Sequence, residues 1–187
     1  AISTVFIPML SKVRFEKNKE EMFKFSNNII SILLVISVIA FALGFVFTDK
    51  IVAFMFDGFN EEKFNLTVFL TRITLFNLLF LSINACYTAM LQVCEDFIIP
   101  SILGMFFNAP MIIYLIFFKD ISIIGLTIAN VIGNFLRVAV QLPVLYKHGY
   151  RFKLFIDLKD ERIKKILILI IPVIIGSGAN SLNMVVD

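Results

Sequence analysis

Four polar side chains lie at helical spacing inside one long apolar run, residues 121–146. They are Asn130, Asn134, Arg137 and Gln141. At about 100° per residue, these four positions fall within roughly a 60° arc of an α-helix. Polar groups in so apolar a helix face a partner helix or a water-filled cavity. The stripe therefore predicts either the lining of a hydrophilic cavity or a set of hydrogen bonds between helices.

Arg137 carries the one formal charge of this run. In a cavity its guanidinium could bind an anionic substrate, whereas near the end of a spanning helix it could extend to the lipid headgroups instead. A similar narrow arc in the run 66–92 is formed by three polar residues, Asn77, Asn84 and Thr88.

Small residues lie beside the stripe. Gly125, Ala129 and Gly133 follow the spacing of four that lets two helices approach closely. We expect the helix to pack tightly along this edge and to present its amides along the next one. In other runs, Pro110 predicts a bend, and Arg72 is expected to act as a structural anchor near the outer boundary.

Groups for enzymatic chemistry are scarce. The chain has no HExxH motif, no Ser–His–Asp set and no glycine-rich phosphate loop. Thirteen of its fourteen Asp and Glu residues lie between the apolar runs, and the fourteenth is Asp187 at the end of the chain. The single histidine, His148, lies in a basic connection and is expected to be solvated. We therefore expect neither an enzyme nor a bound organic cofactor.

The elements that position these residues are long apolar runs. A bilayer core about 30 Å thick needs roughly 20 apolar residues in a helix. Five runs reach or approach that length: 25–48, 73–94 (beginning near residue 66), 97–118, 121–146 and 166–186. Barrel strands would instead alternate in polarity. The predicted fold class is all-α: a polytopic helical membrane protein with five full or nearly full transmembrane helices plus the tail of a sixth at residues 1–11.

Composition and charge agree with this class. Hydrophobic residues make up 59% of the 187 residues and charged residues 17%, which leaves too little polar surface for a soluble domain. Basic residues also lie between the runs rather than on one face, which argues against nucleic-acid binding. Twelve Lys and Arg occupy the connections on one side of the predicted membrane and three occupy those on the other. The side with twelve is predicted to be cytoplasmic.

Two connections carry interleaved apolar and charged residues. Residues 51–56 on the outer side and 150–156 on the cytoplasmic side predict short pieces lying at the membrane surface. A specific lipid-headgroup site is the sharper alternative for such a piece. Because the chain begins with Ala1 and its last apolar run ends at Asp187 without a following loop, we expect it to be a segment of a longer protein.

Four stretches resemble the MurJ/MviN lipid II flippases, a family of the multidrug/oligosaccharidyl-lipid/polysaccharide exporter superfamily. They are residues 1–8 (AISTVFIP), 70–73 (LTRI), 141–143 (QLP) and 172–187 (PVIIGSGANSLNMVVD). The resemblance implies a fragment running from the end of helix 2 through most of helix 7. It divides the chain into part of an N-terminal lobe (1–146), a basic amphipathic cytoplasmic connection (147–165) and the start of the C-terminal lobe (166–187). Asn77 stands where the family often has proline.

The resemblance further implies a monomeric transporter of the bacterial inner membrane. It would move the undecaprenyl-linked peptidoglycan precursor to the outer leaflet by alternating access. Asn130, Asn134, Arg137 and Gln141 are then candidates for the cavity edge, and Asp187 matches an aspartate of sodium-coupled members, making it a candidate Na⁺ site. Two alternatives remain open: a related exporter of drugs or of another polyprenyl-linked oligosaccharide, and a membrane scaffold that transports nothing.

Overall fold

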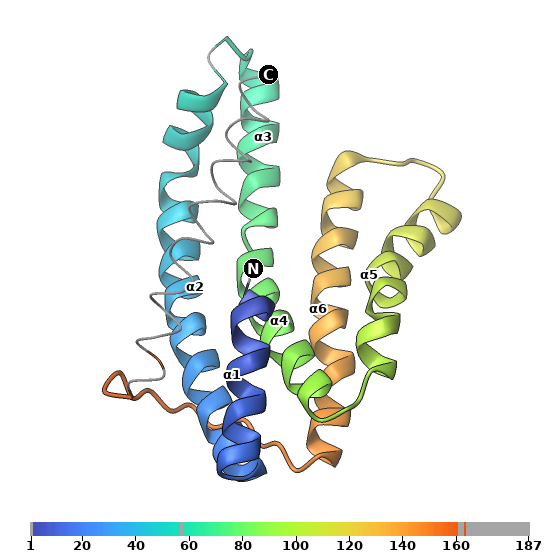
Figure 1. The fold of residues 1–187 in the computed structure, drawn as a ribbon. Coiled ribbons are helices and arrows are strands. Elements are labelled where there is room, and N and C mark those ends of the chain that lie inside the picture. Colours follow the sequence, from blue (N-terminus) through green and yellow to red (C-terminus); the bar gives the residue numbers. More distant parts are fainter. Residues whose placement is uncertain (1, 57, 161–162, 164–187) are drawn as a thin grey trace.

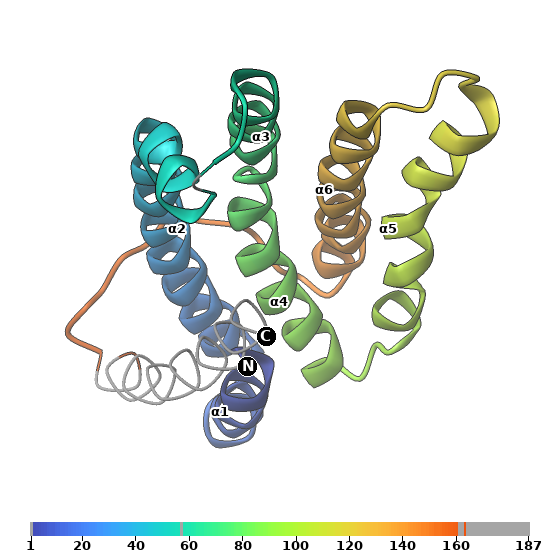
Figure 2. The same ribbon diagram turned by 90° about the horizontal axis from the view of Figure 1, so that it is seen from above.

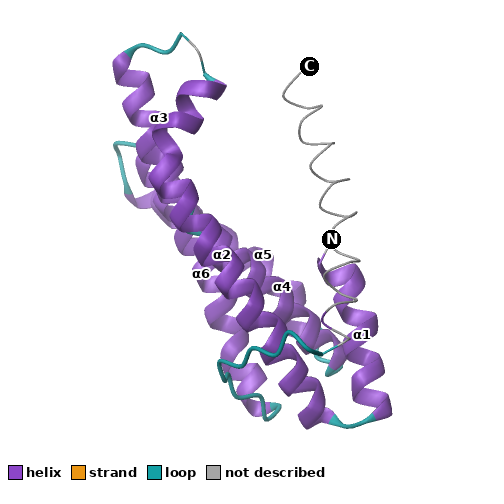
Figure 3. Ribbon diagram, turned by 90° about the vertical axis from the view of Figure 1, so that its left-hand side faces the viewer, coloured by secondary structure: helices purple, strands orange, loops and turns teal. Residues whose placement is uncertain are grey.

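The computed structural model describes residues 2–56, 58–160 and 163, and every regular element in this part of the chain is an α-helix. The helices are α1 (Ile2–Glu16), α2 (Lys19–Met55), α3 (Glu61–Thr74), α4 (Asn77–Val93), α5 (Ile98–Phe117) and α6 (Ile123–Lys147). The long helices form one layer in which α2, α4, α6 and α5 follow one another, with α1 on one side of it (Figures 1, 2 and 3). The predicted all-α class is confirmed.

Four helical stretches of the described chain are long and apolar enough to cross a membrane. They are α2, α3 joined with α4, α5 and α6, at the positions of four of the five predicted spans. The fifth predicted span, 166–186, and Asp187 lie outside the described residues. At the other end, α1 occupies the predicted tail of an earlier helix.

α2 is longer than the apolar run that predicted it. It extends from Lys19 to Met55, 37 residues, whereas the predicted span covered 25–48. Residues 51–55, predicted to lie at the membrane surface, form the last turns of α2 rather than a separate element, and their position at the membrane surface stays a prediction. Charges such as Asp49 and Lys50 mark where apolar sequence stops, but a helix backbone bonded to itself does not need to end there.

A two-residue interruption separates α3 from α4 within one predicted span. The backbone N–H of Phe76 donates to the carbonyl of Ile73, and those of Leu78 and Leu79 donate three residues back, to Leu75 and Phe76. This tighter pattern is that of a 3₁₀ turn. The interruption directly precedes Asn77, the first residue of α4.

Local sequence explains where several helices start and stop. The side chains of Asn18, Asn60 and Ser122 accept hydrogen bonds from the third backbone N–H that follows each of them, and so cap α2, α3 and α6. α6 ends at Lys147, and Gly149, two residues further on, has a φ of 94° that favours glycine. The chain then leaves as an extended connection.

The buried apolar cluster lies at the end of the layer that is predicted to be cytoplasmic. It joins α1, α2, α4 and the last turns of α6, through side chains such as Leu10, Met22, Met90 and Leu145. Away from it, many large apolar side chains of the spanning helices are exposed, among them Val46 of α2 and Ile116 of α5. Such surface suits contact with lipid or with further helices rather than with water.

α5 remains helical through Pro110 from Ile98 to Phe117. Figure 2 shows its axis curved along its length, in agreement with the bend expected at an internal proline. Asn108 and Ser101, two polar side chains of this helix, donate to the carbonyls of Gly104 and Phe97, four residues back in the same helix. α5 therefore makes no use of these two side chains to bind a neighbouring helix.

Candidate functional site

The amides of α6 meet those of α4 across a shared interface, in two groups that we call the amide ladder. In the first group, Asn77 lies between two residues of α6. Its Nδ2 donates to Oδ1 of Asn130 at 3.0 Å, and its Oδ1 accepts from Nδ2 of Asn134 at 3.0 Å. One amide at the start of α4 thus binds two positions of α6 that are one helical turn apart.

The second group of the ladder has the reverse arrangement, with one residue of α6 binding two of α4. Nε2 of Gln141 donates to Oδ1 of Asn84 at 2.8 Å, and its Oε1 accepts from the Thr88 hydroxyl at 3.0 Å. Its second amide hydrogen can reach the backbone carbonyl of Arg137, 2.8 Å away. Gln141 is fully buried, and these three contacts satisfy both of its donors and one acceptor site.

Three of the four residues of the predicted stripe, Asn130, Asn134 and Gln141, therefore belong to this ladder. So do Asn77, Asn84 and Thr88, the three residues of the second predicted arc. Of the two predicted alternatives, a cavity lining and hydrogen bonds between helices, these three residues show the second in this conformation. Asn134 and Gln141 are buried, and Asn130 is half-buried.

Arg137, the fourth residue of the stripe, faces α5 instead of α4. Its guanidinium lies over the ring of Phe107 at 4.5 Å from the centroid, a favourable contact between a cation and an aromatic face. Its Nε is buried and has no hydrogen-bond partner. Among the described residues no carboxylate lies within salt-bridge distance of Arg137, so its charge has no acidic partner in this part of the chain.

The small residues of α6 pack against α5, as their spacing predicts. A Cβ at Gly133 would collide with the backbone carbonyl oxygen of Phe107, and one at Gly125 would collide with the phenol of Tyr114. Ala129, between them, is buried. The prediction of one tightly packed edge beside an edge that presents amides is confirmed, with α5 on the first and α4 on the second.

Arg72 makes the anchoring contact expected of it. Its Nη2 lies 2.7 Å from Oδ2 of Asp49, which joins α3 to the last turns of α2. The guanidinium also lies over the ring of Phe45. Both contacts connect neighbouring helices near the end of the layer that is predicted to be extracytoplasmic.

A second polar interface, which the sequence analysis missed, joins α2 to the connection after α6. Asn28 forms a pair of hydrogen bonds with the backbone of Asp157: its Nδ2 donates to the carbonyl at 2.9 Å, and its Oδ1 accepts from the N–H at 2.8 Å. Ser31 accepts from the N–H of Phe155, and Asn27 donates to the carbonyl of Arg151. The available signal was the group of buried polar residues in the first turns of a spanning helix.

Tyr150 completes this interface. Its hydroxyl donates to Oδ1 of Asn27 at 2.7 Å, and its ring makes edge contacts with Phe23 and Tyr87. The side chain is fully buried, and burial raises the pKa of the Tyr150 phenol above its usual value. The predicted surface piece at 150–156 is thus an extended segment bound to α2 through its backbone.

His148 is not the solvated side chain that the sequence predicted. Its Nε2 lies 3.3 Å from Oδ2 of Asp96, and its Nδ1 lies 3.5 Å from Nζ of Lys19. Nearby, Arg14 of α1 donates to the carbonyl of Val93 and pairs with Glu95. These contacts join the predicted cytoplasmic ends of α1, α2, α4 and α6. The sequence of each helix alone could not predict them, because they depend on which helix ends are neighbours.

Within the described residues no group of three or more His, Cys, Asp and Glu side chains could hold a metal ion. The candidate Na⁺ ligand Asp187 lies outside them. The stripe and the arc that it meets supply hydrogen bonding between amides, together with the guanidinium of Arg137, which has no acidic partner among the described residues. These groups can hold spanning helices together and can meet an anion, but they form no catalytic constellation.

The layer of spanning helices joined by buried amides defines a polytopic helical membrane protein. Comparison with known families makes the assignment specific. The family model described as "Lipid II flippase MurJ" matches residues 1–187. The chain therefore belongs to the MurJ lipid II flippase family, as the resemblance implied.

Several curated proteins are similar to this chain, each named "Probable lipid II flippase MurJ". The protein of Rickettsia prowazekii is 28% identical over 191 residues and that of Buchnera aphidicola subsp. Schizaphis graminum is 29% identical over 185 residues, which cover 100% and 96% of this chain. That of Treponema pallidum is 32% identical over 126 residues, 64% of this chain. The chain spans 38%, 36% and 24% of these three proteins.

Proposed function

We propose that the protein containing this chain is a lipid II flippase of the bacterial inner membrane. It moves the undecaprenyl-linked peptidoglycan precursor from the cytoplasmic to the outer leaflet by alternating access, and it acts as a monomer. The observation that carries this proposal is the family match over residues 1–187. The four membrane-spanning helical stretches support it, because a lipid-linked precursor must be carried across the bilayer.

In this mechanism the amide ladder keeps α4 and α6 together while the lobe rocks. Alternating access is largely rigid-body motion of one bundle against another, so helices of the same lobe must not separate. Interhelical hydrogen bonds in membranes contribute about 0.6–2 kcal/mol each. The ladder has four of them, between Asn77, Asn84 and Thr88 on α4 and three amides on α6.

Within this chain, Asn130 and Arg137 are the residues of the stripe that we propose to meet the substrate. Both are half-buried, whereas Asn134 and Gln141 are buried and bonded to α4. A guanidinium without an acidic partner suits the pyrophosphate of the precursor, because arginine binds phosphate oxygens in a bidentate manner. Asn134 and Gln141 then act as positioning residues at the edge of the cavity.

The experiment is complementation with the full-length protein in cells depleted of their own lipid II flippase. Restored growth and restored appearance of lipid II in the outer leaflet are the expected results. Arg137→Gln should lower translocation, whereas Lys50→Gln, which removes a cation from the last turns of α2, should leave it unchanged. A wild-type protein that inserts normally but restores no translocation of lipid II would exclude the proposed substrate.

Cysteine accessibility separates this proposal from a scaffold. The buried Cys86 and Cys94 would first be replaced by Ala, and single cysteines would then be placed at positions 130, 134 and 141. A cavity edge predicts that a water-soluble thiol reagent labels position 130 and that substrate protects it. In a scaffold that transports nothing, none of the three positions should react.

Coupling to Na⁺ is a further part of the proposal and rests on the resemblance alone. Asp187 would supply a carboxylate to the ion, which is the hard oxygen ligand that such cations prefer. Replacing Na⁺ by choline should then slow translocation by the wild-type protein but not by Asp187→Asn, whose basal rate should already be low. Equal rates of the wild-type protein in both media would remove the ion site.

A further inference from the structure

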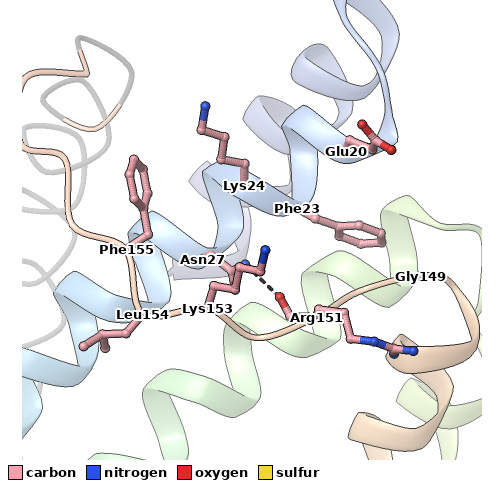
Figure 4. A pocket seen from close by; sticks show the side chains of 9 residues that line it. All are labelled: Glu20, Phe23, Lys24, Asn27, Gly149, Arg151, Lys153, Leu154 and Phe155. Atoms are coloured by element: carbon pink, nitrogen blue, oxygen red, sulfur yellow. Dashed lines mark hydrogen bonds between the residues drawn. The ribbon is translucent and has the colours of Figure 1, made fainter.

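A cavity of about 450 Å³ lies between the first turns of α2 and the connection that follows α6. Its lining includes the buried side chains of Phe23 and Asn27. Lys24, Lys153 and Arg151 also line it, together with the carboxylate of Glu20 (Figure 4). The cavity therefore carries more positive than negative charge, and it lies on the side of the layer that is predicted to be cytoplasmic.

Two of these cations are available to a ligand. Lys153 has no carboxylate within salt-bridge distance in the described part of the chain, and Lys24 has only a partner at 3.8 Å, Glu21 of its own helix. Arg151 is differently placed: its guanidinium lies over the ring of Tyr146 and points away from both lysines in Figure 4. An anion in the cavity would therefore contact the two ammonium groups first.

Apolar side chains beside the cavity indicate which kind of anion the cavity would bind. Leu154 is 71% exposed, and Ile156 and Phe155 are 48% and 39% exposed. The Lys24 ammonium lies 5.9 Å from the centroid of the Phe155 ring, so charge and apolar surface adjoin. A soluble phosphate would leave this apolar surface in water, whereas an amphiphile would cover it.

We propose that this cavity binds the phosphate headgroup of an anionic phospholipid of the cytoplasmic leaflet. Lys24 and Lys153 contact the phosphate oxygens, and Leu154 and Phe155 lie against the upper part of an acyl chain. The backbone of residues 151–157 is bonded to α2, so the two lysines line the same cavity although they come from different segments of the chain. The proposal concerns binding alone and does not depend on which molecule the protein transports.

The test is titration of the purified full-length protein, in a non-ionic detergent, with phosphatidylglycerol, with bound lipid counted by native mass spectrometry. The pocket variant is K24Q/K153Q. The matched control is K17Q/K159Q, which removes the same charge from exposed lysines that do not line the cavity. We expect the Kd to rise on the order of thirtyfold in the pocket variant, because two cations near the phosphate are removed together, and to change less than about twofold in the control.

Two further arms separate a lipid from a soluble phosphate. Glycerol 3-phosphate should fail to displace phosphatidylglycerol at equal concentration, and L154Q should weaken binding of the lipid. Equal losses in the pocket and control variants would overturn the proposal, because binding would then follow net charge alone. Displacement by glycerol 3-phosphate as strong as by the lipid, with L154Q unaffected, would also overturn it and assign the cavity to a soluble anion.

Discussion

Gln141 of α6 donates a 2.8 Å hydrogen bond to Oδ1 of Asn84 of α4, inside a region that is otherwise apolar. The same side chain accepts from Thr88, so that one amide joins two turns of the neighbouring helix. Lipid offers no competing partner for such groups. The pairing therefore contributes to the stability of the helix layer and also specifies which faces of α4 and α6 meet.

Replacing Gln141 by Met tests this contribution. The substitution keeps the length of the side chain but leaves Asn84 and Thr88 without their partner. We expect the free energy of unfolding to fall by about 1–3 kcal/mol, measured as a shift in the SDS-induced unfolding of the full-length protein. Asn108→Leu is the control, because Asn108 is exposed and bonds only within its own helix. A loss no larger than that of the control would mean that the ladder does not hold the two helices.

Gly133→Ala should separate α5 from α6. The added methyl would meet the backbone oxygen of Phe107, which cannot turn away as the end of a side chain can. We expect a loss of about 1–3 kcal/mol, read from the thermal unfolding of the full-length protein. Gly104→Ala is the matched control, since nothing lies within 4 Å of its new methyl, and it should be neutral or slightly stabilising. Equal behaviour of the two variants would contradict the close approach at Gly133.

Asn28→Leu should release the connection after α6 from α2. The variant loses both hydrogen bonds to Asp157, while Asn28→Asp keeps the acceptor and loses only the donor. Hydrogen exchange at the Phe155 and Asp157 amides should therefore quicken most in Asn28→Leu and less in Asn28→Asp. Ser101→Ala, which removes a hydroxyl bonded within α5, should leave these amides unchanged. Unaltered protection in Asn28→Leu would show that other contacts hold the connection.

The Tyr150 phenol makes the same connection sensitive to alkali. Burial raises the pKa of this group, so the folded protein keeps the proton that an unfolded chain releases near pH 10. The stabilising contribution is complete below that unfolded pKa and is lost as the pH rises toward the folded pKa. The contacts of residues 150–157 should therefore weaken above about pH 10. Tyr150→Phe should remove this alkaline loss, as seen by hydrogen exchange, while lowering protection at neutral pH.

The sequence predicted which residues share a face of a helix, but it did not predict which neighbouring helix each face contacts. The rotation of about 100° per residue placed Asn134 and Gln141 on one arc and Gly133 on the next, and the structure keeps both assignments. It also placed Asn77 and Asn84 on an arc of their own. That the two polar arcs meet depends on which helices are neighbours, and this information is not present in either run.

The connection after α6 shows a different limit. Residues 151–157 bind α2 through backbone carbonyl and N–H groups, which every residue type possesses, so their own side chains give no signal. Only the receiving side chains, Asn27, Asn28 and Ser31, are unusual for the start of an apolar span. His148 was misjudged for a related reason, since Asp96 lies 52 positions away in the sequence.

The branched form of the two groups in the ladder restricts axial sliding of α4 along α6. Asn77 of α4 is bonded to residues 130 and 134 of α6, and Gln141 of α6 is bonded to residues 84 and 88 of α4. The residue that makes two bonds is thus on α4 in one group and on α6 in the other. A shift of either helix by half a turn, in either direction, would break these hydrogen bonds and leave buried amides without partners in a low-dielectric medium. Sliding these two helices past each other therefore requires far more free energy than tilting them together, and the pair should move as one rigid unit.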